Sequence, residues 1–262
     1  MSSVAEAVVT DAVTYEVEDR VAWLTINRPE RRNALSREVR EGLWAGVRRF
    51  NDDDEAAVLV LTGAGETAFC AGGDLKEMAD ETLRVPPVDF LPQFGRNIDV
   101  PKPTIAAVNG AAFAGGFLLT QCCDLVIASE TASFGITEVK VGRGAPWAAP
   151  LPWMIPARVA MQMLLTGDPI SPSRAREVGL VNEVVQGEEL RERVQVLARR
   201  IADNAPLSVR AAKRTVRLVA ELSLSDAYAE AERIWEPVYM SEDAQEGPAA
   251  FRDKRRPNWS GR

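Results

Sequence analysis

Polar and apolar positions alternate near the start of the chain and predict a β-hairpin. Residues 13–18 and 21–27 both alternate, and Asp19-Arg20 separates them as a turn would. A helix is predicted next, because Ser36 is a suitable N-cap. Apolar residues then recur at helical spacing and fall on one face: Val39, Leu43, Val47 and Phe50.

Four short apolar runs further along the chain are typical of buried strands. They occupy residues 57–62, 105–108, 125–128 and 180–185, and helical patterns lie between several of them. This order of elements predicts an α/β fold. Residues 79–100 contain three prolines and no clean period, which indicates an irregular excursion or loop.

The chain after about residue 188 has a helical period throughout. Three apolar sets share a spacing of three or four: Leu190, Val194, Leu197 and Ile201; Val209, Ala212, Val216 and Val219; and Tyr228, Ala231, Trp235 and Val238. We expect these faces to pack against the core or a partner subunit. No long Pro/Gly/Ser-rich linker divides the chain, so we predict a main domain over residues 1–200 and a helical region over residues 201–262.

Composition removes several kinds of chemistry. The 262 residues include no histidine, which excludes Ser-His-Asp and Cys-His catalysis and the usual zinc sites. Proton transfer must then fall to Asp, Glu, Lys, Tyr or Cys. The net charge of −7 argues against nucleic-acid binding. Cys70, Cys122 and Cys123 form neither a disulfide framework nor a spaced metal motif, so we expect no metal.

The N-terminal stretch, residues 1–11, carries acidic residues and lacks the apolar core of a signal peptide. No window holds eighteen consecutive apolar residues, so we expect no membrane association and a cytoplasmic location.

Two segments combine a predicted strand with glycines and the start of a helix. In the first, residues 57–62 lead through a turn to residues 69–75; in the second, residues 104–108 lead through Asn109-Gly110 to residues 111–118. Backbone N–H groups at such a junction have no partner, and glycine lets a ligand approach them closely. The pair predicts a place that binds a developing negative charge.

In this order the two segments resemble the crotonase (enoyl-CoA hydratase/isomerase) family. Its patterns are A-G-x-D-L, then K-P-x-I-A-A-V-N-G-x-A with a later C-D, then a segment ending in P-E. Here they match residues 71–75, residues 102–112 with Cys123-Asp124, and residues 134–138, and the resemblance extends over residues 13–257. It implies a spiral of β-β-α units with a C-terminal helical trimerisation region.

The resemblance also implies a reaction through a thioester enolate. Carried over by position, the two backbone N–H donors of the oxyanion hole are Ala71 and Gly115, and the base is Glu138. The family's hydratases use a further glutamate, whose position here holds Leu118, and Thr137 replaces the proline before Glu138. A leucine cannot activate water, which argues against hydration through two carboxylates.

A single carboxylate suffices to move a proton from C2 to C4 of a 3-enoyl thioester, as in the family's single-glutamate isomerases. We therefore expect 3-enoyl-CoA to 2-enoyl-CoA isomerisation. Alternatives are a hydratase using Glu138 alone, a thioester hydrolase or decarboxylase, or a non-catalytic acyl-CoA-binding subunit. Pro146 stands where dienoyl isomerases carry a further acid, which argues against that reaction.

Expected substrate contacts follow from the same matched positions. Arg28 and Lys254 are expected to bind coenzyme A, and Phe251 is a further expected substrate contact. The others are Gly72, Asp74 and Leu75 in the first glycine segment, and Leu118 and Trp147, with Phe117, as apolar walls. The side chain of Asp74 is more typical of a helix cap, that of Asp124 of a structural hydrogen bond, and that of Cys70 of packing.

Arg143 stays open: it could pair with Glu138, bind a polar acyl group or point to solvent, with solvent or a structural pair favoured. The resemblance implies a homotrimer or hexamer and no cofactor beyond the coenzyme A of the substrate.

Overall fold

The computed structural model describes residues 7–262, so the predicted absence of a signal peptide falls partly outside the described residues. The strands are β1 (Ala7–Thr10), β2 (Val13–Glu18), β3 (Val21–Ile26), β4 (Val58–Gly63), β5 (Ala68–Cys70), β6 (Thr104–Val108), β7 (Ala111–Phe113), β8 (Leu125–Ser129), β9 (Ser133–Gly135) and β10 (Glu183–Val185). The α-helices are α1 (Arg37–Asp52), α2 (Leu75–Asp80), α3 (Gly115–Cys122), α4 (Leu151–Met154), α5 (Ala157–Thr166), α6 (Pro172–Glu177), α7 (Leu190–Ala202), α8 (Pro206–Leu218), α9 (Leu224–Tyr239) and α10 (Glu242–Arg252). Short 3-10 helices are η1 (Pro29–Arg31), η2 (Thr137–Val141), η3 (Pro146–Ala148) and η4 (Gly187–Glu189).

A seven-stranded sheet with the order β1-β2-β3-β4-β6-β8-β10 forms the base of the molecule. The predicted hairpin is confirmed, since β2 and β3 pair antiparallel, and the strands from β3 to β10 run parallel. Alternate residues of each strand serve two separate clusters. Leu24 packs in the cluster that contains Leu43 of α1, and Trp23 in the cluster that contains Val194 of α7.

A second, three-stranded parallel sheet has the order β5-β7-β9. The chain passes repeatedly between the two sheets, from β4 to β5, from β6 to β7 and from β8 to β9. Helix α2 follows β5, helix α3 follows β7, and η2 follows β9. This is the predicted spiral of β-β-α units, and it places three helix starts at one edge of the small sheet.

Local signals account for the elements that were predicted well. Ser36 caps α1 by accepting a hydrogen bond from the Val39 N–H, and the predicted apolar face of α1 is buried. The irregular stretch predicted over residues 79–100 is confirmed except for its first two residues, which end α2, and no helix or strand occurs over residues 81–103. The strand expected over residues 180–185 is shorter, because Asn182 instead uses its side-chain oxygen to accept a hydrogen bond from Val126 N–H at 2.8 Å.

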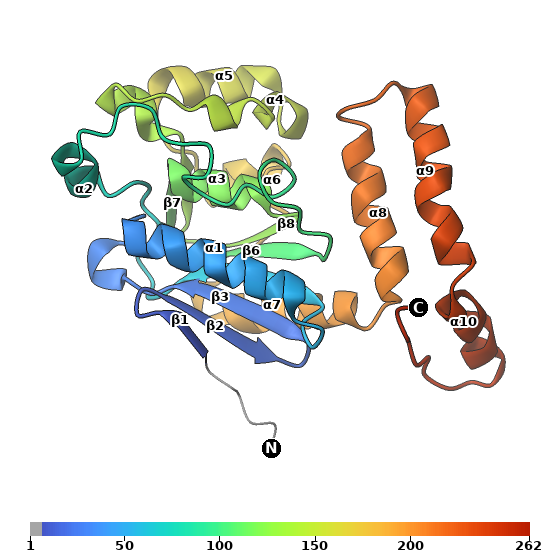
Figure 1. The fold of residues 1–262 in the computed structure, drawn as a ribbon. Coiled ribbons are helices and arrows are strands. Elements are labelled where there is room, and N and C mark those ends of the chain that lie inside the picture. The colour runs from blue at the N-terminus through green and yellow to red at the C-terminus, as the bar shows by residue number, and fades with distance from the viewer. Residues whose placement is uncertain (1–6) are drawn as a thin grey trace.

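Helices α8, α9 and α10, which we call the helical arm, stand beside the sheets (Figure 1). Lys213 of α8 joins the arm to the body, because its Nζ donates to the Lys102 carbonyl and pairs with Asp124, both at 2.7 Å. Four of the predicted packing positions remain exposed within the chain, namely Ala212, Val216 at 78%, Val219 at 65% and Tyr228 at 66%. These apolar side chains have no cover within the described residues.

Helix α7 packs under the large sheet up to Ala202, so the predicted boundary between residues 200 and 201 falls in its last turn, and the division into two regions stays a prediction. None of the helices in residues 7–262 combines the length and apolarity needed to cross a lipid bilayer.

Candidate active site

A cavity of about 450 Å³ lies at the carboxyl ends of β5, β7 and β9. Each strand contributes residues that directly follow it, namely Gly73 after β5, Gly115 after β7 and Glu138 after β9. The irregular segment of residues 81–103 and the turn of residues 143–147 supply the remaining walls. Carboxyl ends of parallel strands commonly form ligand sites, which makes this cavity the candidate active site.

The two glycine segments touch one another at the floor of the cavity. Gly72 has φ +95°, and a Cβ added to it would lie 2.8 Å from the Cβ of Ala114. A Cβ on Gly116 would overlap the carbonyl oxygen of Cys70. Only glycine permits this approach at both positions, so the sequence itself brings the start of α3 against the end of β5.

The structure corrects one of the two predicted oxyanion donors. Ala71 lines the cavity, but its N–H donates to the Arg32 carbonyl at 3.0 Å and is therefore occupied. Gly73 lines the same cavity, and its N–H has no acceptor within residues 7–262. The donor pair that the structure supports is Gly73 with Gly115, whose N–H lies in the first turn of α3 and lacks an intrahelical acceptor.

A strained residue fixes the second donor. Ala114, directly before α3, has φ 51° and ψ −119°, a conformation that L-residues rarely adopt. Its N–H donates to the Gly135 carbonyl at 2.9 Å, which ties the end of β7 to the end of β9. Such strain costs about 1–3 kcal/mol and persists where the surroundings enforce it. Here the enforced turn sets the direction of the Gly115 N–H.

Glu138 lies buried on η2 and is, within residues 7–262, the one carboxylate that lines the cavity. Its Oε1 accepts a hydrogen bond from Trp147 Nε1 at 3.2 Å, whereas its Oε2 is buried and has no partner within residues 7–262. Burial raises the pKa of Glu138 above its ordinary value, and its own N–H and the Trp147 indole oppose that rise. A carboxylate with one free oxygen and a raised pKa is suited to proton transfer.

Two of the three predicted apolar walls, Leu118 and Trp147, line the cavity with Glu138, and the third, Phe117, does not. Leu118 is 5% exposed and lines the cavity together with Trp147. Phe117 does not reach the cavity; it packs against Trp147 with ring centroids 5.9 Å apart. Gln121 Nε2 donates to the Trp147 carbonyl at 2.9 Å. Trp147 is thus held from two sides, which fixes the indole that contacts Glu138.

Arg143, whose role the sequence left open, lines the cavity and does not pair with Glu138. Its Nη1 donates to the Leu83 carbonyl at 2.7 Å, in the irregular segment. Its Nη2 is buried and has no partner within residues 7–262. The predicted structural role therefore accounts for Nη1 and leaves Nη2 without an assigned role.

Other predicted substrate contacts lie at different distances from the cavity. Leu75 lines it, and Asp74 caps α2, as its position indicated. Arg28 does not line the cavity; its Nη1 lies 3.7 Å from Asp74 Oδ2. Neither Phe251, which is 88% exposed on α10, nor Lys254 lines the cavity, since α10 stands at the far end of the helical arm (Figure 1).

Cys70 and Asp124, which we expected to have structural roles, have such roles in the fold. Burial raises the pKa of the Cys70 thiol to about 12, which keeps it an unreactive packing group. Asp124 accepts hydrogen bonds from the Thr104 N–H and hydroxyl. Within the described part of the chain, no group of three or more His, Cys, Asp or Glu side chains is placed to hold a metal ion.

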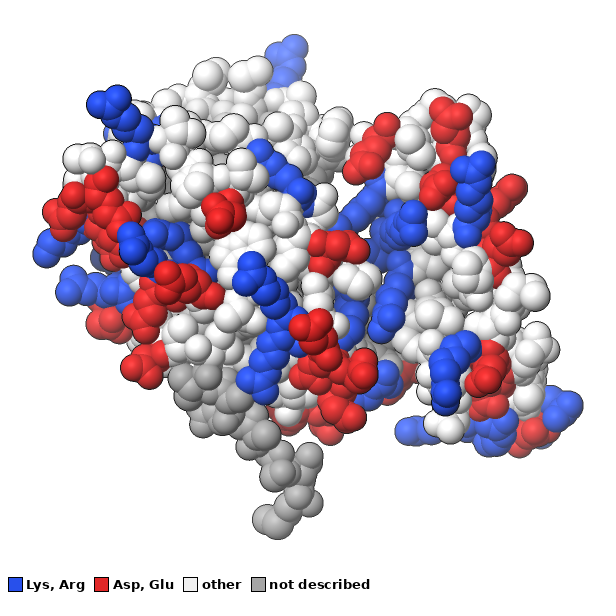
Figure 2. All heavy atoms as spheres, in the orientation of Figure 1, with Lys and Arg blue, Asp and Glu red and all other residues white. Residues whose placement is uncertain are grey.

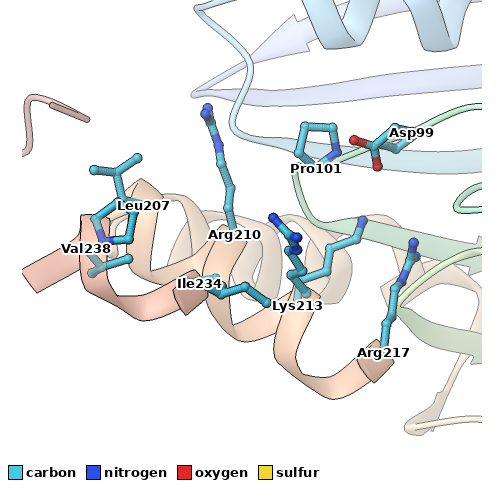
Figure 3. Close-up of a pocket in the computed structure, with 12 residues that line it drawn as sticks. Asp99, Pro101, Leu207, Arg210, Lys213, Arg217, Ile234 and Val238 are labelled. Carbon is cyan, nitrogen blue, oxygen red and sulfur yellow. The ribbon is translucent and has the colours of Figure 1, made fainter. Parts of the chain in front are cut away.

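A second cavity, of about 310 Å³, lies between α8, α9 and the segment before β6. Figure 3 shows Arg210, Lys213 and Arg217 rising from α8 toward Asp99 and Pro101. The same region appears in Figure 2 as a hollow lined with basic side chains between the body and the arm. Its lining includes the carboxylate of Asp99, and its Lys213 and Arg217 both bind Asp124. The two glycine segments and Glu138 line the first cavity, which is therefore the candidate active site.

Comparison with known proteins points to one family. The sequence pattern that defines the family described as enoyl-CoA hydratase/isomerase matches residues 16–262. An (E)-benzylidenesuccinyl-CoA hydratase of Thauera aromatica is 41% identical over 261 residues, covering 95% of this chain and 99% of that protein. A carnitinyl-CoA dehydratase of Proteus mirabilis is 37% identical, covering 92% and 95%. The crystal structure of an enoyl-CoA hydratase/isomerase from Mycobacterium paratuberculosis superposes with a TM-score of 0.89 at 35% identity, covering 96% and 99%.

Proposed function

The chain belongs to the enoyl-CoA hydratase/isomerase family, and on that premise we propose that it converts a 3-enoyl-CoA thioester into the 2-enoyl isomer. One observation carries the proposal: among the described residues Glu138 is the one carboxylate lining the cavity, and Leu118 occupies the position where the family's hydratases have another. A single carboxylate can serve both proton transfers of an isomerisation.

The reaction follows from the positions of three groups. The thioester oxygen accepts hydrogen bonds from the Gly73 and Gly115 N–H groups, which stabilise the charge that forms there. Glu138 Oε2 takes a proton from C2, and the electron pair moves into the thioester to give an enolate. The protonated Glu138 then returns its proton at C4, the double bond shifts to C2–C3, and the carboxylate is restored. Burial supports this cycle, because a raised pKa stabilises the protonated state between the two transfers.

Hydration of a 2-enoyl-CoA is the second candidate. It is favoured by the names of the relatives, which are a hydratase and a dehydratase. In this chain Glu138 alone would have to activate the water and supply the proton for C2. The apolar Leu118 side chain offers no second group to hold that water.

One experiment separates these reactions. The protein is incubated with a 2-enoyl-CoA and a 3-enoyl-CoA of matched chain length, and hydration and double-bond migration are followed separately. Isomerisation without hydration supports the proposal. Hydration faster than isomerisation replaces it with the second candidate, and binding of both thioesters without turnover indicates a non-catalytic acyl-CoA-binding subunit.

We further propose that the active protein is a homotrimer or hexamer and that it needs no cofactor beyond the coenzyme A of its substrate. The exposed apolar side chains of the helical arm support assembly, since Val216 and Tyr228 need cover. Assembly also offers Lys254 a route to the cavity of a neighbouring subunit. Sedimentation measures the mass directly, and a monomer at catalytic concentrations would refute this arrangement.

A further inference from the structure

The guanidinium of Arg143 is half satisfied inside the candidate active site. Nη1 is held by the Leu83 carbonyl, while Nη2 is buried with no hydrogen-bond partner in the described chain. A buried donor without a partner is destabilising, and more so when the group is charged. Native structures keep such a group where something else, such as a ligand, completes its hydrogen bonds.

No acidic side chain neutralises this charge. No carboxylate oxygen in residues 7–262 lies within 4.0 Å of the Arg143 guanidinium. Glu138 receives the Arg143 N–H at its backbone carbonyl, at 2.9 Å, yet its side chain is bound to Trp147 instead. Arg143 is therefore a cation without a counter-charge in the cavity that holds the base.

The other two cations that line the cavity are already engaged. Lys140 pairs with Asp168 at 2.7 Å, and Arg96 Nη1 donates to the side-chain oxygen of Gln93 at 2.7 Å. Of the three, only Arg143 combines a buried free donor with the lack of a carboxylate partner. It is the cation best placed to meet a group of the acyl chain.

We propose that the acyl group of the substrate carries a carboxylate, and that Arg143 binds it through Nη2. This inference rests on the proposed acyl-CoA function. A carboxylate fits better than a neutral acceptor, because it supplies both the hydrogen bond and the missing charge, and arginine binds carboxylates through parallel N–H donors. The substrate class is the coenzyme A thioester of a dicarboxylic acid.

The test measures binding of saturated, unreactive thioesters, so it does not depend on which reaction the enzyme performs. Glutaryl-CoA is compared with pentanoyl-CoA, and adipoyl-CoA with hexanoyl-CoA, by calorimetry. The variants are Arg143→Gln, which removes the charge, Arg143→Lys, which keeps it, and Arg96→Gln as the matched control. Circular dichroism and thermal melting check that each variant folds.

We expect the wild type to bind a dicarboxylic thioester about 10- to 100-fold more tightly than its neutral partner, the usual range for a hydrogen bond to a charged group. Arg143→Gln should abolish that preference by lowering the affinity for the dicarboxylic thioester, Arg143→Lys should restore part of it, and Arg96→Gln should not alter it. Equal affinities in the wild type, or a preference that survives Arg143→Gln, would overturn the inference. Failure of the proposed isomerisation looks different: the binding preference remains while a 3-enoyl-CoA is not converted.

Discussion

Replacing Glu138 by glutamine tests the role of the base most directly. Glutamine keeps the shape of the side chain, and its carbonyl oxygen can still accept the Trp147 Nε1 hydrogen bond. It cannot take a proton from C2. Loss of an essential acid/base group costs about 10²- to 10⁴-fold in rate, or about 2.7–5.4 kcal/mol in the activation free energy.

The same substitution should leave the fold at least as stable at neutral pH. Because burial raises the pKa of Glu138 above its ordinary 4.5, the folded protein binds this proton more tightly than the unfolded chain does. Stability therefore falls as pH rises from the ordinary carboxyl pKa through the raised one, and glutamine removes that loss. The gain in stability over wild type should disappear below about pH 4.5.

The assay follows formation of the conjugated thioester from a 3-enoyl-CoA, with calorimetric binding of a saturated acyl-CoA as a second readout. Glu130→Gln, at an exposed glutamate that does not line the cavity, is the matched control. A Glu138→Gln variant that binds thioester and retains more than about a tenth of the wild-type rate would refute the assignment of the base.

Three further predictions concern the rest of the site. Leu118→Glu should raise hydration relative to isomerisation of matched enoyl thioesters, and Leu118→Gln should not; equal effects would show that a carboxylate at this position is not what hydration lacks. Gly116→Ala should lower kcat by at least about tenfold and reduce stability by about 1–3 kcal/mol, because the added Cβ overlaps the Cys70 carbonyl. An unchanged kcat and melting temperature would show that the close approach of α3 to β5 does not matter for the site. Lys254→Ala should weaken coenzyme A binding about two- to fivefold at low salt and less at high salt; unchanged affinity at low salt would exclude this lysine from the binding site.

The parts of the fold that the sequence predicts are those set by short-range signals. The hairpin of β2 and β3 follows from alternation, and α1 from the Ser36 cap and a single apolar face. Short-range signals do not predict the spiral of β-β-α units; the resemblance of two glycine segments to a known family does. The glycines of these segments are informative because the close contacts at Gly72 and Gly116 leave no room for a side chain.

The choice of oxyanion donor could not be predicted in the same way. Which N–H is free after β5 depends on Arg32, whose carbonyl takes the Ala71 N–H and leaves that of Gly73. Arg32 lies far from Ala71 and Gly73 in sequence, and the residues around Arg32 do not indicate that its carbonyl accepts this hydrogen bond. The signal that favours Gly73 is the second of two adjacent glycines, which leaves room for a ligand beside the backbone.

The direction of the Arg143 side chain could not be predicted from the sequence either. Its direction depends on the Leu83 carbonyl, in a segment without regular structure, so no periodic pattern could place it. The helical arm is a further case. Its helices are strongly predicted, but whether their apolar faces pack within the chain depends on how the arm leaves α7.

The leucine at residue 118 and the burial of Glu138 both favour the proposed isomerisation. Isomerisation needs the same group to hold a proton between two carbons, and water that reached the enoyl thioester could add to it instead. Leu118 lines the same cavity with a buried apolar side chain, which offers no group to hold a water, and burial raises the pKa of Glu138. If Glu138 alone transfers the proton, as proposed, the leucine at residue 118 favours isomerisation over hydration, while N–H donors at Gly73 and Gly115 suit an enolate in both reactions.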